Sequence, residues 1–210
     1  MQIESTGNGH KVWLTPDEYE QLREYAANRP LDEPDKSSPK HHATVLLGGK
    51  VGLRAQEIAE MRYEHVRKDD EGYYRLRVPE SAGKDTTGGG GKARDAWIPT
   101  DVERDLLEIR FELERDDDER LLGVEKSRVR QIVRDLGDEM AEETGNPDWE
   151  RLSSHDLRRF FAQSLLVREN ANIHTVMAVG GWSSPDALAP YLAQPTEQQI
   201  RDEMVAAGWD

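Results

Sequence analysis

Several short motifs of this chain contain the side-chain types that the cleavage of a phosphodiester bond requires. The candidate residues in these motifs are Arg54, His155, Arg158, Trp182 and Tyr191. The reaction needs a nucleophile, a group that binds the non-bridging oxygens, a proton acceptor and a proton donor for the leaving oxygen. Arginine suits the non-bridging oxygens because its planar guanidinium makes bidentate contacts with phosphate and keeps its charge.

The spacing of these residues predicts that some of them share a pocket. His155 and Arg158 are three positions apart in "SSHDLRRFF", and residues at i and i+3 lie on one face of a helix. Tyr191 follows Trp182 by nine positions in "GGWSSPDALAPYLAQ". A tyrosine hydroxyl has an ordinary pKa of about 10, so nearby guanidiniums and a neutral histidine would be needed to favour its ionised form. The indole N–H of Trp182 is a donor that suits an oxyanion.

A glycine-rich loop between two strand patterns is the expected place of the proton donor. "GYYRLRVPE" alternates in polarity as a strand does, and "RDAWIPT" reads as a second short strand that ends at a proline. The intervening loop contains consecutive glycines from Gly88 to Gly91. Two strands around such a loop predict a hairpin, and a lysine on the loop can reach a leaving oxygen.

The rest of the chain has helical patterns. Thr15 is an expected N-cap, with Pro16 at the first helical position, and Ser154 is an expected N-cap for a later helix. The predicted helices cover residues 16–28, 41–52, 54–66, 101–115, 125–145, 155–170, 172–181 and 196–208, and residues 29–40 are predicted to form a loop. We therefore expect a mainly α protein with a small antiparallel sheet, either a hairpin or three strands.

The composition restricts the class of protein and its setting. The net charge is −14, which ordinarily disfavours binding to a phosphate backbone. The acidic residues are dispersed and lysine is scarce, a pattern that favours adaptation to high salt, where the Debye length falls to about 3 Å. The chain has no cysteine, which excludes disulfides and thiolate metal sites. It has no apolar signal segment, and its longest apolar run, "ATVLLGG", is too short to span a bilayer. We expect a soluble cytoplasmic protein.

Taken together, "GLRAQEIAEM", a hairpin lysine, "HDLRR", "GGW" and a tyrosine nine positions further resemble the catalytic domain of the tyrosine recombinases, the phage-integrase family. The resemblance covers about residues 15–205 and keeps the family's order of motifs. With the acidic composition, it favours an origin in a haloarchaeon or its virus.

The resemblance implies a role for each residue. Arg54 would be the first arginine that binds the phosphate, with Glu57 as its acidic companion, and His155 and Arg158 would be the family's His-x-x-Arg pair. Lys84, which follows the first hairpin strand directly, would be the general acid; Lys92 is its competitor. Trp182 stands where the family has His or Trp. Tyr191 would attack the DNA, form a 3′-phosphotyrosine and release a 5′-hydroxyl. Neither a cofactor nor a metal is implied.

The resemblance also implies an organisation and partners. Residues 1–14 would be a lead-in, and residues 15–210 would be the catalytic domain. Family members assemble as dimers and tetramers on double-stranded DNA, so the C-terminal segment 196–210, with Ile200 and Met204 on one face, is a candidate for exchange between subunits. Recombinases usually carry a core-binding domain before the catalytic one. We therefore expect either an integrase with a catalytic domain only, for which a separate core-binding or accessory protein would supply the other half, or a missing N-terminal part.

Other interpretations remain open. Each candidate has an ordinary structural explanation when taken singly: Arg54 could pair with Glu57 or Glu60, and Trp182 could fill a core. The main alternative is a non-catalytic DNA-binding accessory or regulatory protein of the same fold. A phosphoesterase that acts through His155 and a DNA-relaxing topoisomerase are further alternatives.

Overall fold

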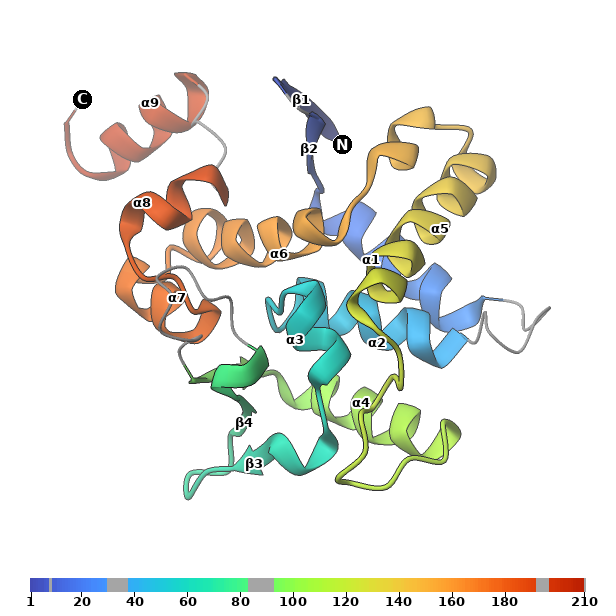
Figure 1. Ribbon diagram of the computed structural model, residues 1–210. Coiled ribbons are helices and arrows are strands. Elements are labelled where there is room, and N and C mark those ends of the chain that lie inside the picture. The colour runs from blue at the N-terminus through green and yellow to red at the C-terminus, as the bar shows by residue number, and fades with distance from the viewer. Residues whose placement is uncertain (8, 30–37, 83–92, 192–196, 210) are drawn as a thin grey trace.

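The computed structural model describes residues 1–7, 9–29, 38–82, 93–191 and 197–209, and these form a mainly helical body with small antiparallel sheets (Figure 1). The α-helices in this part of the chain are α1 (Pro16–Asn28), α2 (Ser38–Gly49), α3 (Ala55–Glu60), α4 (Thr100–Glu112), α5 (Lys126–Thr144), α6 (Ser154–Gln163), α7 (Ile173–Gly180), α8 (Pro185–Leu188) and α9 (Glu197–Ala206). The strands are β1 (Gln2–Thr6), β2 (Gly9–Trp13), β3 (Val66–Lys68), β4 (Tyr74–Val78) and β5 (Arg94–Ile98). The predicted fold class is therefore confirmed.

The predicted hairpin strands form the centre and one edge of a sheet. β4 pairs antiparallel with β5, with Leu76 opposite Ala96, and β3 adds to the other side of β4 in the order β3-β4-β5. On β5, the alternation of the strand turns Arg94, Ala96 and Ile98 inward. The glycine-rich loop, with both Lys84 and Lys92, lies outside the described residues.

The N-terminal lead-in is more structured than the sequence suggested. β1 and β2 form an antiparallel hairpin that pairs Gln2 with Trp13. The backbone N–H of Val12 donates to the Asp156 carboxylate at 2.9 Å, and Val12 is fully buried. The hairpin is thereby joined to the start of α6.

Local capping signals predicted some helix ends well. Thr15 caps α1 with its side chain, while Glu18 returns a contact to the Thr15 N–H at 2.8 Å. The predicted cap of α6 is wrong by one position, because Ser153 is the cap. The reason is Asp156, which stands three positions after Ser153 and accepts from both its N–H and its hydroxyl; this is the spacing of a capping box.

Four predicted helices have different extents. The helix predicted over 101–115 is α4, which ends at Glu112, and the backbone turns to a positive φ of 51° at Glu114. The helix predicted over 54–66 ends at Glu60, because the Met61 carbonyl accepts from Leu121 N–H at 2.8 Å, and a 3₁₀ turn and β3 follow. The helix predicted over 41–52 is α2, which begins and ends earlier. The helix predicted over 155–170 becomes a π-helix at Ser164–Arg168. Of the loop predicted over residues 29–40, residues 38–40 belong to α2, and residues 30–37 are outside the described part.

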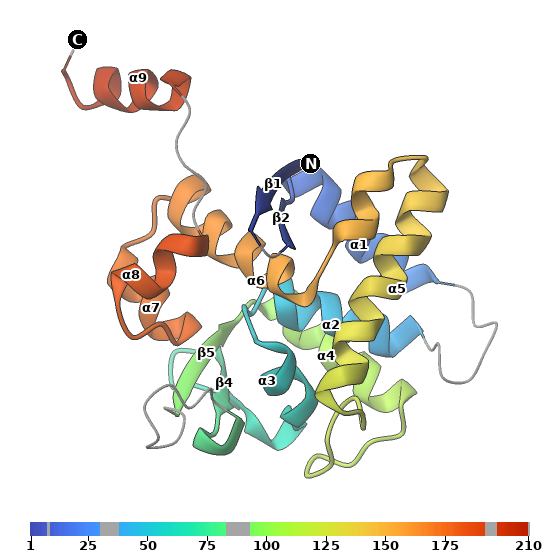
Figure 2. The ribbon, with the colours of Figure 1, turned by 45° about the horizontal axis from the view of Figure 1, so that its top comes forward.

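Helix α6 stands between the packed parts of the molecule. Its Leu157 and Phe160 belong to a core with α1, α5 and the hairpin, whereas Phe161 packs with Trp182 and Leu188. Figure 2 shows α7 and α8 at one end of the body, beside the sheet, and α1 and α5 at the opposite end. Among the described residues, no helix has the length and apolar character needed to cross a membrane.

Candidate active site

The first predicted arginine is held at the start of α3. Arg54 is the N-cap residue, and its backbone N–H donates to Glu57 Oε2 at 2.8 Å. Its Nη1 donates to Glu57 Oε1 at 2.9 Å. The side chain of Glu57 has no exposed surface, whereas that of Arg54 is 23% exposed. Glu57 therefore holds the backbone N–H and one guanidinium nitrogen of Arg54, while part of this side chain stays open to solvent.

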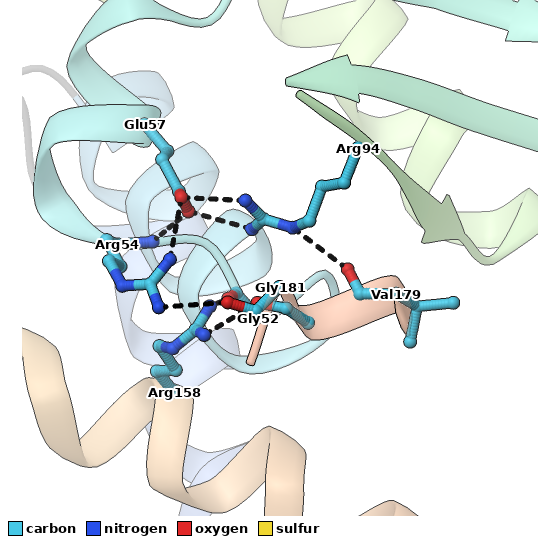
Figure 3. Close-up of polar contacts among 8 residues, drawn as sticks. Gly52, Arg54, Glu57, Arg94, Arg158, Val179 and Gly181 are labelled. Atoms are coloured by element: carbon cyan, nitrogen blue, oxygen red, sulfur yellow. Dashed lines mark hydrogen bonds and ion pairs between the residues drawn. The ribbon is translucent and has the colours of Figure 1, made fainter. Parts of the chain in front are cut away.

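The carbonyl end of α7 gathers arginines from different elements (Figure 3). Arg54 Nη2 donates to the Gly181 carbonyl at 3.3 Å, and Arg158 Nη2 donates to the Gly180 carbonyl at 2.6 Å. The last carbonyls of a helix have no partner within the helix and carry partial negative charge. The guanidiniums satisfy these carbonyls, which explains how residues 104 positions apart in the sequence come to one place.

Arg158 and Trp182 form one packed unit. Arg158 is 1% exposed, and its Nη1 donates to the Gly52 carbonyl. Its Cζ lies 3.9 Å from the centre of the Trp182 ring, a distance at which a guanidinium is attracted by the aromatic face. Trp182 itself is 6% exposed and stacks on Phe161. Trp182 therefore fills a small core and also supports the Arg158 guanidinium.

His155 lies in the first turn of α6 and is exposed. Partial desolvation of the ring and the positive charges of Arg159 and Arg158 lower its pKa below the ordinary value. The imidazole is consequently neutral at pH 7, which is the form that accepts a proton.

Arg94 is a site residue that sequence reasoning missed. It is the first residue of β5, it is 9% exposed, and its Nη1 and Nη2 donate to Glu57 at 2.7 and 2.8 Å. Its Nε donates to the Val179 carbonyl at 3.1 Å. The available signal was the alternation of "RDAWIP", which places an arginine on the apolar face of a strand, where a buried charge requires a partner.

The arginines keep the Glu57 carboxyl ionised. Burial alone would raise the pKa of Glu57, but the hydrogen bonds and charge of Arg94, with the charges of Arg158 and Arg54, lower it to about 2. At neutral pH this cluster has guanidiniums at Arg54, Arg94 and Arg158 against the single carboxylate of Glu57. The cluster is therefore locally positive in a chain of net charge −14, and it suits an anionic ligand.

Asp156 is a second residue that the motif analysis passed over. It is 1% exposed and accepts from Val12 N–H, from Ser153 and from the Arg159 guanidinium. The signal was present as the acid of the capping box. Asp156 holds the helix turn that carries His155.

Of the remaining predicted residues, only Tyr191 lies in the described part of the chain. Tyr191 ends a 3₁₀ turn, Ala189–Tyr191, that packs against α6, the helix of His155 and Arg158. Lys84 and Lys92 lie outside the described residues. The described part of the chain thus brings Arg54, Arg158 and Trp182 together.

Comparison with known proteins identifies the family of this chain. The model of the phage integrase family matches residues 12–198, and the chain belongs to that family. A search of curated proteins found no match.

Solved structures of recombinases share the fold. The XerA recombinase superposes with a TM-score of 0.66 at 21% identity, covering 93% of this chain and 65% of that chain. The Tn1549 transposon integrase in complex with a circular intermediate DNA gives a TM-score of 0.70 at 18% identity, with 97% and 68% covered. The XerH recombinase bound to a palindromic difH substrate, in a post-cleavage complex, gives 0.68 at 16% identity, with 96% and 55% covered. The chain therefore spans between about half and two thirds of the length of these proteins.

Proposed function

We propose that this protein is a site-specific DNA recombinase that cleaves and rejoins double-stranded DNA through Tyr191. The observation that carries the proposal is the convergence of Arg54 and Arg158 on the carbonyls at the end of α7. Arg158 comes from α6, the helix that also carries His155 in its first turn. Fixed guanidiniums stabilise the charge that develops on phosphate oxygens during transfer. Membership of the phage integrase family and the DNA bound in the similar structures of the Tn1549 integrase and XerH support the same reaction.

In the proposed reaction the Tyr191 oxygen attacks the phosphorus, and the bond from phosphorus to the 5′-oxygen breaks. His155 accepts the tyrosine proton, and Lys84 donates a proton to the leaving oxygen, with Lys92 as the alternative donor. The product is a 3′-phosphotyrosine and a 5′-hydroxyl. Attack by a 5′-hydroxyl of another strand reverses the step and releases Tyr191, so the phosphoester bond energy is kept and ATP is not needed.

Binding of the phosphate changes the partners of Arg158. Its guanidinium donates to the carbonyls of Gly52 and Gly180, and in the proposed complex a phosphate oxygen replaces one of them. The contact between Trp182 and Arg158 supports a positioning role for this tryptophan. Donation by the indole N–H of Trp182 to the phosphate remains a prediction.

The proposed working form is a dimer or tetramer on DNA. The surface of α9 supports this, because its Ile200 and Met204 are exposed at 42% and 43% and are suited to packing on another subunit. We propose that segment 196–210 is passed to a neighbouring subunit. A core-binding domain, in the same or a separate protein, would bind the other side of the DNA.

The proposed setting is the cytoplasm of a haloarchaeon, where the host or a virus supplies the protein. The dispersed acidic surface and the net charge of −14 support it. In molar salt, charge acts over only about 3 Å, so the local arginines bind phosphate despite the acidic remainder.

Covalent trapping tests the proposed function. A pool of nicked duplexes with a randomised centre is incubated with the protein in molar KCl, and adducts are resolved on a denaturing gel. The wild type should give adducts whose DNA strands all contain the same sequence, whereas Tyr191→Phe should give no adduct. Tyr73→Phe is the matched control, because Tyr73 is an exposed tyrosine just before β4, and its replacement should leave the adduct unchanged.

The other outcomes separate the alternatives. Sequence-specific binding without an adduct would favour the accessory DNA-binding protein. An adduct that persists in Tyr191→Phe and disappears in His155→Asn would favour phosphoryl transfer to histidine.

A further inference from the structure

Arg94 contacts both of the structures that hold Arg54 and Arg158. Its guanidinium fork binds the Glu57 carboxylate at 2.7 and 2.8 Å, and its Nε binds the Val179 carbonyl at 3.1 Å (Figure 3). Bidentate arginine–carboxylate pairs fix orientation as well as charge. The side chain is 9% exposed, so it is held inside the protein.

Glu57 links Arg94 to Arg54, because its carboxylate accepts hydrogen bonds from both residues. Oε1 of Glu57 accepts from Arg94 and from Arg54 Nη1, and Oε2 accepts from Arg94 and from the Arg54 backbone N–H. A carboxylate has about four lone-pair sites, and these contacts occupy them. Glu57 is thus held in one orientation, which in turn fixes Arg54.

The contact with Val179 transmits the position of Arg94 to the end of α7. The next carbonyls along the chain, those of Gly180 and Gly181, accept from Arg158 and Arg54. Trp182, which lies against Arg158, follows directly. A shift of the Val179 carbonyl would therefore move both arginines.

Charge gives Arg94 a second effect on Arg54. Arg54, Glu57 and Arg94 together carry a net charge of +1. Without Arg94, Arg54 and Glu57 would form a neutral pair, and the carboxylate would compete with a phosphate for the Arg54 guanidinium.

We propose that Arg94 is a positioning residue that holds Glu57 and the end of α7 so that Arg54 and Arg158 meet the scissile phosphate. The inference rests on the proposed recombinase function. It assigns no contact with DNA to Arg94 itself.

The variant Arg94→Lys tests the inference, because lysine keeps the charge but loses the planar fork. We expect single-turnover adduct formation at saturating protein to fall about 10- to 100-fold, as expected for misplaced reacting groups. DNA affinity should change by no more than about threefold, because other contacts with the DNA backbone remain. Arg94→Gln is the second variant, and it should also lower stability because it leaves Glu57 buried without its main partner.

Arg29→Lys is the matched control. Arg29 is 7% exposed and binds the Glu139 carboxylate with its Nε at 2.5 Å, so it is also a buried arginine paired with a glutamate. It lies at the end of α1, away from the cluster around Glu57. Its replacement should leave adduct formation near the wild-type rate.

A spectroscopic measurement separates failure of this inference from failure of the proposed function. In Arg94→Lys, the side-chain ¹⁵N signals of Arg54 should shift and the Glu57 carboxyl should titrate at higher pH by ¹³C NMR. If Arg94→Lys forms the adduct at the wild-type rate, the inference is overturned. If the wild-type protein forms no adduct, the proposed function fails, and unchanged Arg54 and Glu57 signals in Arg94→Lys would then overturn the inference separately.

Discussion

Replacement of Gly181 by alanine should disturb the cluster through one added carbon. Gly181 ends α7 with φ of +71°, and a Cβ placed there would lie 2.7 Å from Arg94 Cδ and 2.8 Å from its Nε. Gly145 ends α5 with a left-handed backbone too, with φ of +68°, but nothing lies within 4 Å of its added Cβ. Gly145→Ala is therefore a control for backbone strain alone.

The expected cost can be worked from these contacts. Left-handed backbone costs an L-residue ~1–2 kcal/mol, and alanine recovers ~0.4–1 kcal/mol by restricting the unfolded chain. Gly145→Ala should therefore lower the free energy of unfolding by about 1 kcal/mol. Gly181→Ala should cost ~1–3 kcal/mol more, the usual range for an overpacked site, because Arg94 is bonded at both ends and has little room to move.

The assay is denaturant unfolding of both variants and the wild type in the same molar KCl. In a chain of this length each kcal/mol corresponds to about 2–4 °C in Tm, so thermal unfolding is a second measure. Gly181→Ala should also slow adduct formation, whereas Gly145→Ala should not at a temperature where both are folded. Equal stability losses in the two variants would refute the reasoning, since they would mean that Arg94 yields without cost.

Three further predictions concern charged groups. The folded-state pKa of Glu57 is lowered from 4.5 to about 2. Above pH 5 the ionised carboxylate therefore contributes about 3 kcal/mol to the free energy of unfolding, and this contribution is lost as the pH falls towards 2. In acid unfolding curves, the stability difference between the wild type and Glu57→Gln should shrink over that range. The lowered pKa of His155 predicts that adduct formation declines on acidification with a midpoint below pH 6.5, and a pH–rate profile of His155→Asn should lack this limb if the histidine is the base. Asp156→Ala removes the capping box and the tether to Val12 and should cost ~2–4 kcal/mol; a loss below 1 kcal/mol in urea unfolding would contradict the assigned contacts.

Local signals account for what could be predicted about the fold. The Thr15 cap, the end of α5 next to Gly145 and the alternating strands β4 and β5 depend on neighbouring residues, and the structure has them where the patterns predicted. The N-cap of α6 was misplaced for a local reason, the capping box of Ser153 and Asp156, but two other errors have tertiary causes. The helix over 54–66 ends early because the Met61 carbonyl bonds Leu121, and the N-terminal lead-in forms a hairpin that is tied to Asp156. Neither partner is near in sequence.

The sequence by itself determined the family, the mainly α class with a small antiparallel sheet, and the residue types of the candidate site. These could be predicted because motif order, helix caps and strand alternation depend on residues that are close in the sequence. Only the tertiary structure decided how those residues are held. Arg94 reaches Glu57 across 37 positions and α7 across 85, and Arg158 is buried beneath the carbonyls of Gly52 and Gly180. Such contacts follow from the packing of α3, α6, α7 and β5 against one another, since a buried guanidinium takes whichever acceptors the surrounding backbone presents.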